Sequence, residues 1–134
     1  TNSLTLVDVP DMSVTITPTA TSSAILIVTA LNIVHFSTST NDVRGVYVIA
    51  DAANNTISGT NYAVVGAIFP GTGTVSRNFY SMVSVVAYDT PATTSATTYK
   101  LQLMAENASA NVRVAGSTNL AQMYALEVSA LPRH

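Results

Sequence analysis

Hydrophobic and polar residues alternate along several short stretches of the chain. In residues 99–103 the apolar side chains share one face and Lys100 and Gln102 share the other, which is the pattern of a strand with one dry and one wet side. Residues 4–6 and 12–17 alternate in the same way, with Pro10 between them. Because proline interrupts strand pairing, we expect two short strands in this first part of the chain.

Four longer runs are apolar on both faces. They cover residues 24–36, 45–50, 62–69 and 79–88. A strand of this kind must be covered on both sides. In an antiparallel domain of this length the core of a sandwich covers one side, and loops or another subunit cover the other. Several such strands therefore predict an oligomer.

Segments rich in Thr, Ser, Asn, Gly and Pro separate these strands and supply turns at hairpin distances. With two further strands in residues 111–115 and 122–131, we expect eight to ten strands in total. No stretch keeps the three- and four-residue spacing of an amphipathic helix. The predicted fold is all-β: an antiparallel jelly roll, or another β-sandwich, formed by residues 1–134 as a single domain.

The composition agrees with one folded domain and narrows its partners. The chain has 134 residues, 48% of them hydrophobic, which is enough apolar surface for a core. Its five basic residues are scattered singly and the formal net charge is −2, so nucleic acid is not an expected partner. No apolar run reaches the roughly 18 to 20 residues of a spanning helix, so membrane insertion is not expected either.

Two further features concern where the chain is made and what surrounds it. Cysteine is absent, which excludes disulfides and thiolate metal sites and favours synthesis in a reducing cytoplasm. The chain begins at Thr1 without a methionine or a leader-like segment. We interpret it as the C-terminal part of a longer chain rather than as a processed product.

Few side chains are suited to catalysis. The seven carboxylates lie almost all in or beside predicted turns, where capping is their ordinary role, so a pair that hydrolyses glycosides is not expected. His35 lies in an apolar strand with no second histidine near it in the sequence, which favours a hydrogen-bonded core or interface residue over a zinc ligand. We therefore expect no enzymatic activity, no metal and no cofactor.

Glu127 is the exception among the carboxylates, because it lies in the middle of a predicted strand and shares a face with Met123 and Ala125. A buried carboxylate must be paired or protonated. We expect a buried or interface ion pair of Glu127 with Lys100 or Arg113. A ring of carboxylates around a threefold axis, binding a cation, is the alternative.

Three motifs follow one another in the last third of the chain. Residues 88–91 read Tyr-Asp-Thr-Pro, residues 99–103 read Tyr-Lys-Leu-Gln-Leu, and residues 123–128 read Met-Tyr-Ala-Leu-Glu-Val. A polar loop separates the first two, and an Asn-bearing hairpin precedes the third. This succession resembles the C-terminal β-sandwich heads of phage tail fibres and related virion appendages. Residues 9–16 also look like the opening strand of such a head.

The resemblance implies a jelly roll similar to the tumour-necrosis-factor and C1q domains, assembled as a homotrimer around a threefold axis. In such heads the second apolar face of the inner sheet packs against neighbouring subunits, in agreement with the strands that are apolar on both faces. The chain lacks the clustered acidic residues of appendages that cut polysaccharides, which puts depolymerase activity in doubt.

The function that the resemblance implies is non-enzymatic. We expect the trimeric receptor-binding head of a tail fibre or spike, on the exterior of a virion, that attaches to a glycan or protein of the host surface and gains avidity from its three copies. A capsid decoration or head-fibre protein that clamps neighbouring shell subunits is the first alternative. A C1q-like module that binds carbohydrate or protein is the second.

The expected contact surface consists of loops. Tyrosines within strands, Tyr88 and Tyr124 among them, are expected to fill the core. The candidate receptor contacts are polar residues in or beside loops and one neighbouring tyrosine: Asn41, Asp42, Arg44, Asn54, Asn55, Arg77, Asn78 and Tyr80.

Overall fold

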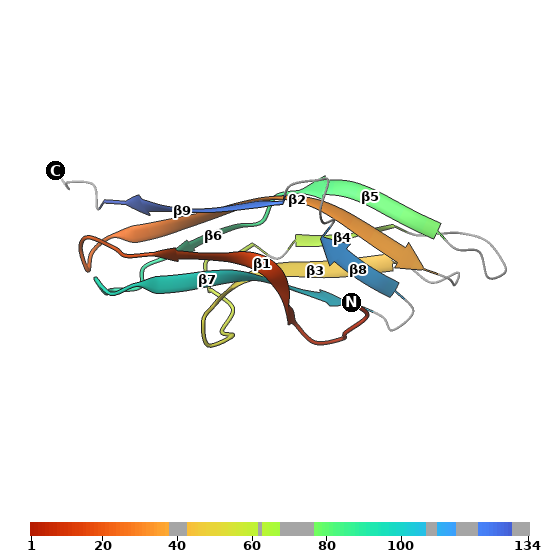
Figure 1. Ribbon diagram of the computed structural model, residues 1–134, viewed down its shortest axis with the longest axis horizontal. Coiled ribbons are helices and arrows are strands. Elements are labelled where there is room, and N and C mark those ends of the chain that lie inside the picture. The colour runs from red at the N-terminus through yellow and green to blue at the C-terminus, as the bar shows by residue number, and fades with distance from the viewer. Residues whose placement is uncertain (38–42, 62, 68–76, 107–109, 115–120, 130–134) are drawn as a thin grey trace.

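The residues that the structure describes contain nine β-strands and no helix. The computed structural model describes residues 1–37, 43–61, 63–67, 77–106, 110–114 and 121–129, and no helix in this part of the chain could span a membrane. The strands form two antiparallel sheets that lie one over the other, an arrangement compatible with a β-sandwich (Figure 1). The prediction of an all-β chain is therefore confirmed. The strands are β1 (Val7–Ile16), β2 (Ala24–Ser37), β3 (Val43–Asp51), β4 (Ala63–Ala67), β5 (Arg77–Val83), β6 (Val86–Asp89), β7 (Thr97–Ala105), β8 (Ala110–Val114) and β9 (Gln122–Val128).

The first sheet, which we call the β3 sheet, has the strand order β1-β7-β3-β4. In β7 the side chains of Tyr99, Leu101 and Leu103 belong to the core, whereas Lys100 faces outward and bonds to β1. The period-two alternation of residues 99–103 thus predicted both the strand and its buried face. β3 is buried on both sides over most of its length.

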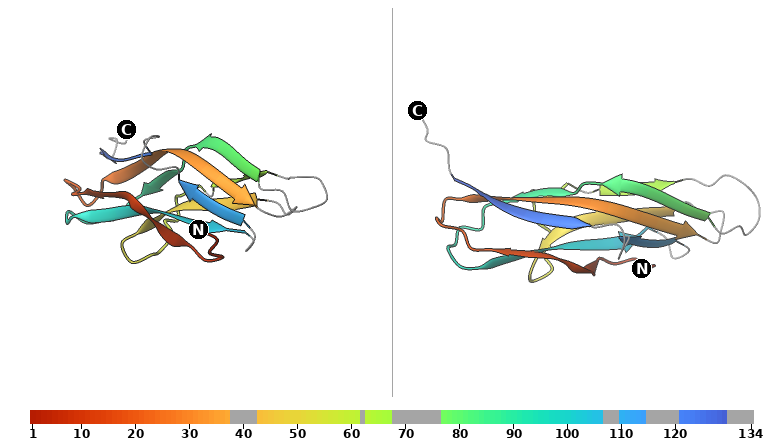
Figure 2. Two further views of the ribbon diagram at one scale, coloured as in Figure 1. Left: turned by 45° about the vertical axis from the view of Figure 1, so that its right-hand side comes forward. Right: turned by 45° about the horizontal axis from the view of Figure 1, so that its top comes forward.

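The second sheet, which we call the β2 sheet, is built around one long strand. The first half of β2 pairs with β6 on one side and with β9 on the other. Its second half pairs with β5 and β8. β5 and β6 therefore follow one another along one edge of β2, and β8 and β9 follow one another along the other edge. Figure 2 shows β2 running along the length of the molecule.

A break separates β5 from β6 at Ser84 and Val85, so the single strand expected over residues 79–88 is wrong. Thr29 of β2 lies opposite the break and is fully buried. Its Oγ1 donates to the carbonyl of Val85 (3.0 Å) and accepts from the N–H of Val85 (2.9 Å). Ser84 Oγ donates to the carbonyl of Thr29 (2.6 Å). The threonine side chain thus supplies hydrogen-bond partners to the backbone of Val85, where strand pairing with β2 is interrupted.

β1 also differs from the expectation, because one strand replaces the two that were expected on either side of Pro10. Its register against β7 shifts between Asp8 and Ser13. Asp11 lies in this interval with a φ of 61°, in the left-handed region. A bulge of this kind takes up extra residues and lets the strand resume its pairing beyond the proline.

Side chains from both sheets fill the space between them. The interior includes Ile25 and Ile27 of β2 together with Tyr47 and Leu101 of the β3 sheet, all fully buried. The core therefore forms between the sheets, as a β-sandwich requires.

Two segments outside the strands bond to edges of the β2 sheet. Thr1 pairs with Val112 of β8 through two backbone hydrogen bonds of 2.6 and 2.7 Å. On the opposite side of the sheet, the N–H of Tyr88 donates to the carbonyl of Gly59 (3.3 Å), and the N–H of Asn61 donates to the carbonyl of Val86 (3.0 Å). Among the described residues, the ladder of β9 is with β2 alone.

Candidate functional site: the outer face of the β2 sheet

Large apolar side chains cover the outer face of the β2 sheet. Ile25 and Ile27 point into the core, so the alternate residues Leu26 and Val28 point outward. Tyr88 of β6 and Leu126 of β9 lie on either side of Leu26 in the strand register. A second row, one step along β2, consists of Val86, Val28 and Tyr124.

This surface continues over β5 and is exposed to solvent. Tyr80 pairs with Val34 and Met82 pairs with Asn32, and the two β5 side chains are 67% and 83% exposed. Of the nine exposed large apolar side chains in the described residues, only Leu4 and Val64 lie elsewhere. The other seven, which we call the apolar face, are Tyr80, Met82, Val86, Tyr88, Tyr124, Leu126 and Val128.

The expectation that the strand tyrosines fill the core is wrong for two of them. Tyr88 and Tyr124 are 56% and 52% exposed, whereas Tyr47 and Tyr99 are fully buried. The difference follows from strand parity, because Tyr88 and Tyr124 lie beside the outward-facing positions of β2. Sequence periodicity cannot choose a face when both faces of a strand are apolar.

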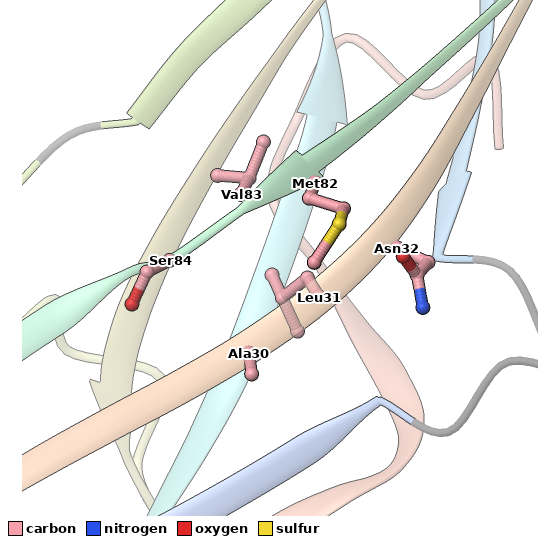
Figure 3. A pocket seen from close by; sticks show the side chains of 6 residues that line it. All are labelled: Ala30, Leu31, Asn32, Met82, Val83 and Ser84. Atoms are coloured by element: carbon pink, nitrogen blue, oxygen red, sulfur yellow. The ribbon is translucent and has the colours of Figure 1, made fainter.

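The apolar face contains a hollow at the break between β5 and β6. It has a volume of about 310 Å³ and is lined by Ala30, Leu31 and Asn32 of β2 together with Met82, Val83 and Ser84. Figure 3 shows the side chains that line it, drawn from two neighbouring strands and the residue that follows β5. The interruption that Thr29 bridges therefore also opens the surface of the sheet.

The end of the β2 sheet formed by β5 and β8 is more polar. Asn78 and Asn111 lie on either side of Phe36 in the register, and both are exposed. Arg113 pairs with Val34 and is also exposed. The apolar face is thus bounded on this side by amide and guanidinium groups.

The structure does not gather the candidate receptor contacts into one surface. Arg44 lies on β3, where it forms an ion pair with Glu106 (3.3 Å). Asn78 and Tyr80 belong to β5 of the other sheet. The remaining candidates are Asn54 and Asn55, which are exposed in the β3–β4 connection, and Asn41, Asp42 and the side chain of Arg77, which lie outside the described residues.

The turn that carries Asn54 and Asn55 is held by Asp51. One oxygen of its carboxylate accepts from the N–H groups of Ala53 and Asn55, both at 2.9 Å, and the other accepts from the side-chain amide of Asn55 (3.1 Å). These bonds, led by that of the Asn55 backbone, lower the pKa of Asp51. Asn54 has a φ of 69°, a conformation that asparagine tolerates better than most residues.

The expected ion pair of Glu127 with Lys100 or Arg113 is wrong within the chain. Glu127 Oε1 accepts from the backbone N–H of Thr19 (2.7 Å) and from its hydroxyl (2.8 Å). The pKa of Glu127 is lowered by hydrogen bonds, with that from Ser23 the largest contribution. Lys100 instead bonds to Asp8 (3.0 Å). Glu127 faces the β1–β2 turn at the end of β9, and a short hydroxyl and a backbone N–H supply the partners there.

His35 is a hydrogen-bonded core residue, as expected. It is fully buried, and its Nε2 lies 2.8 Å from the hydroxyl of Tyr47. The two rings are stacked with an interplanar angle of 7°, and Phe79 packs against the histidine at 5.8 Å between ring centroids. Its Nδ1 is sealed from solvent without a hydrogen-bond partner. Burial lowers the pKa of His35 and raises that of Tyr47, so both groups are neutral near pH 7.

Gly45 makes room for this histidine. A Cβ at this position would lie 3.0 Å from Val112 Cγ1 and 3.1 Å from His35 Nε2. Both distances are tighter than ordinary van der Waals contact. The glycine in β3 therefore allows β8 and the histidine ring to approach the strand closely.

In the part of the chain that the structure describes, the apolar face is exposed and no metal-binding group of side chains is found. No three His, Cys, Asp or Glu side chains there are grouped so as to hold a metal ion. No protein-family model, curated protein or solved structure matches the chain. The apolar face is therefore the feature on which a functional argument rests.

Proposed function

We propose that the chain is the homotrimeric receptor-binding head of a phage tail fibre or spike, exposed on the virion and without enzymatic activity. The observation that carries the proposal is the apolar face of the β2 sheet, with Met82 83% and Tyr80 67% exposed. Soluble monomers rarely expose contiguous apolar patches larger than a few hundred Å². Contact between identical copies around a closed axis removes such a face from water in every subunit.

The order of the strands supports a jelly roll, and in the proposed trimer the β2 sheet with its apolar face would lie at the threefold axis. Successive strands pass from one sheet to the other: β1 lies in the β3 sheet, β2 in the β2 sheet, and β3 with its hairpin partner β4 in the β3 sheet again. β5 and β6 return to the β2 sheet, β7 to the β3 sheet, and β8 and β9 to the β2 sheet. Strands that alternate between two packed sheets in this way are typical of jelly rolls.

The assembly is tested by the mass of the purified chain in solution. Light scattering should give about 42 kDa, three times the chain mass of 14.0 kDa. A mass of about 14 kDa would leave the apolar face in water and would overturn the trimer. A stable mass of about 28 kDa would also overturn it, because two copies would then suffice to cover the face.

The attachment role is tested with the assembled protein. Fluorescently labelled chain should bind the surface of bacterial cells of the host species and should compete with the virus for adsorption. Binding to purified capsids with no binding to cells would reject the receptor-binding role. That result would assign the chain to capsid decoration instead.

A further inference from the structure

A second hollow lies on the outer face of the other sheet, away from the apolar face. It has a volume of about 380 Å³ and is lined by Leu6, Val7 and Asp8 at the start of β1, by Gln102 of β7 and by Asn54 of the β3–β4 connection. Three segments that are far apart in the sequence thus meet at one place. Asp8, Asn54 and Gln102 bring polar groups to the lining, and Leu6 and Val7 complete it.

Gln102 is the central group of this hollow. The residue is only 3% exposed, and its side-chain N–H groups donate to Asp8 Oδ1 (2.8 Å) and to Asn54 Oδ1 (3.2 Å). Because Asp8 Oδ1 only accepts, these bonds fix which end of the amide is nitrogen. No described residue donates to Gln102 Oε1. The one unpartnered side-chain atom sealed from solvent in the described residues is His35 Nδ1, so Gln102 Oε1 is not sealed from solvent, and Gln102 is one of the residues that line the hollow.

Asp8 supplies a charged acceptor. Hydrogen bonds from Gln102 and then Lys100 lower the pKa of Asp8, so its carboxylate is ionised near pH 7. Its side chain is 56% exposed, while that of Lys100, 3.0 Å away, is 15% exposed. The ammonium group balances the carboxylate charge, and the carboxylate oxygens keep lone pairs for a further donor.

Asn54 completes the set. Its Oδ1 accepts from Gln102, and no described residue accepts from its Nδ2. The hollow therefore offers two acceptors, the Asp8 carboxylate and Gln102 Oε1, one amide donor, and apolar residues, Leu6 and Val7, in its lining. A neutral pyranose matches this arrangement, because neighbouring hydroxyls both donate and accept hydrogen bonds and the C–H groups of the ring pack on apolar side chains. An anionic ligand is disfavoured by the carboxylate.

We propose that this hollow, with Asp8, Asn54 and Gln102 as its polar contacts, is a binding site for a neutral sugar. The assignment rests on the proposed attachment function and deepens it by naming the ligand class and the site. The trimer would present three such hollows on outward-facing sheets, so that individually weak contacts add through multivalency. The apolar face and the sugar site then serve different partners, copies of the chain and the host surface.

The site is tested by two-dimensional NMR of the purified chain with methyl glycosides of glucose, galactose, mannose and rhamnose, and with sialic acid. At least one neutral sugar should shift the side-chain amide signals of Gln102 and Asn54 at concentrations up to about 50 mM, well above a millimolar dissociation constant. Sialic acid should shift them less. If no neutral sugar moves these signals, or if sialic acid moves them most, the proposal is overturned.

Two variants locate the binding. Asp8→Asn should weaken binding and raise the dissociation constant about tenfold, because a hydrogen bond to a charged acceptor is lost. Asn54→Gly removes the amide donor while glycine accepts the positive φ of this position, and it should also weaken binding. The matched control is Glu106→Gln, which alters another carboxylate paired with a cation, at the residue that follows β7, and should leave binding unchanged. If Asp8→Asn and Asn54→Gly bind the sugar as tightly as Glu106→Gln does, the site is rejected.

The experiments distinguish a failure of the sugar site from a failure of the attachment role. Attachment of wild-type trimer to cells with full retention in Asp8→Asn and Asn54→Gly would reject this site and leave the attachment role standing. Sugar binding at the hollow without any attachment to cells would reject the attachment role and leave the site standing.

Discussion

The outer faces of the two sheets differ in the side chains that they expose to solvent. On the β3 sheet, Val48 and Ala50 are fully buried although their neighbours Tyr47 and Ile49 face the core, and Asp8 bonds to Lys100 and Gln102 across the face. On the β2 sheet, seven large apolar side chains remain exposed.

The difference shows that apolarity on both faces of a strand has two structural solutions. β3 and β2 are both apolar on both faces in the sequence. The outer side of β3 is buried within the chain, whereas the outer side of β2 adjoins exposed tyrosine, methionine, valine and leucine side chains. The prediction of an oligomer from such strands therefore depends on β2 and its neighbours.

The largest effect is expected from a charge placed on the apolar face. Leu126→Asp should reduce the mass in solution from about 42 kDa to about 14 kDa, because an unpaired carboxylate would have to be desolvated at the contact between copies. Val64→Asp is the matched control. Val64 is 54% exposed and Leu126 is 50% exposed, but Val64 lies on the β3 sheet and its variant should keep the wild-type mass. Loss of assembly in both variants, or in neither, would contradict the contrast between the faces.

The next effect concerns Thr29, which joins the two strands at one edge of the β2 sheet. Thr29→Val leaves the N–H of Val85 without its acceptor in a buried position, so we expect a loss of about 2 kcal/mol in the free energy of unfolding. Thr15→Val removes a comparable hydroxyl bond, to Thr98, from an exposed position on the β3 sheet and should cost less than about 0.5 kcal/mol. Urea denaturation of the two variants measures the difference. Similar losses would show that Thr29 does not bridge the break.

A smaller effect should appear in the pH window that starts at 6.5 and extends down to the lowered pKa of His35. Burial lowers the pKa of His35 below its ordinary value of 6.5. The unfolded chain therefore binds a proton at a higher pH than the folded chain does. Stability from His35 is complete above pH 6.5 and falls as the pH decreases through this window, by at most about 1.4 kcal/mol per pH unit.

Denaturation at several pH values, together with the NMR signals of the His35 ring, checks this expectation. The lowered pKa values of Asp8, Asp51 and Glu127 affect stability near or below their ordinary values of 3.8 to 4.5, well below the pH of 6.5 at which the effect of the histidine begins. A ring that titrates at 6.5 in the folded protein would contradict the account.

The smallest effect is expected for the ion pair between Arg44 and Glu106. Their side chains are 51% and 34% exposed, and exposed pairs contribute little in water. Glu106→Gln should change the free energy of unfolding by no more than about 0.5 kcal/mol, as measured by urea denaturation at low and at high salt. A loss above about 1 kcal/mol would show that the polar contacts on the outer side of the β3 sheet are a major source of stability.

Local patterns predicted the strands better than the contacts between them. The alternation of residues 99–103 was sufficient to place β7 and its buried side, and the long apolar run starting at Ala24 was sufficient for β2. The pattern around Pro10 misled because proline reads as a strand end, whereas a bulge at Asp11 carries the strand past it. The partner of Glu127 depends on where the β1–β2 turn lies, which no local pattern contains.

The candidate site was foreseen only in part. Apolarity on both faces predicted a contact between copies, which stays a prediction, and the placement of Tyr88 and Tyr124 outside the core required the register of β6 and β9 against β2. The hollow around Gln102 was missed because its polar groups come from residues 8, 54 and 102, which only the folded sheet brings together.

The position of β2 between four other strands also has a consequence for the order in which the chain folds. β2 is synthesised early, but its partners in β9 lie roughly a hundred residues further along the chain, and such distant contacts are slow to form. Until they arrive, a long apolar strand has open edges that invite pairing with other chains. Refolding should therefore be sensitive to protein concentration, and the amides of β2 should exchange with solvent only when the whole domain opens.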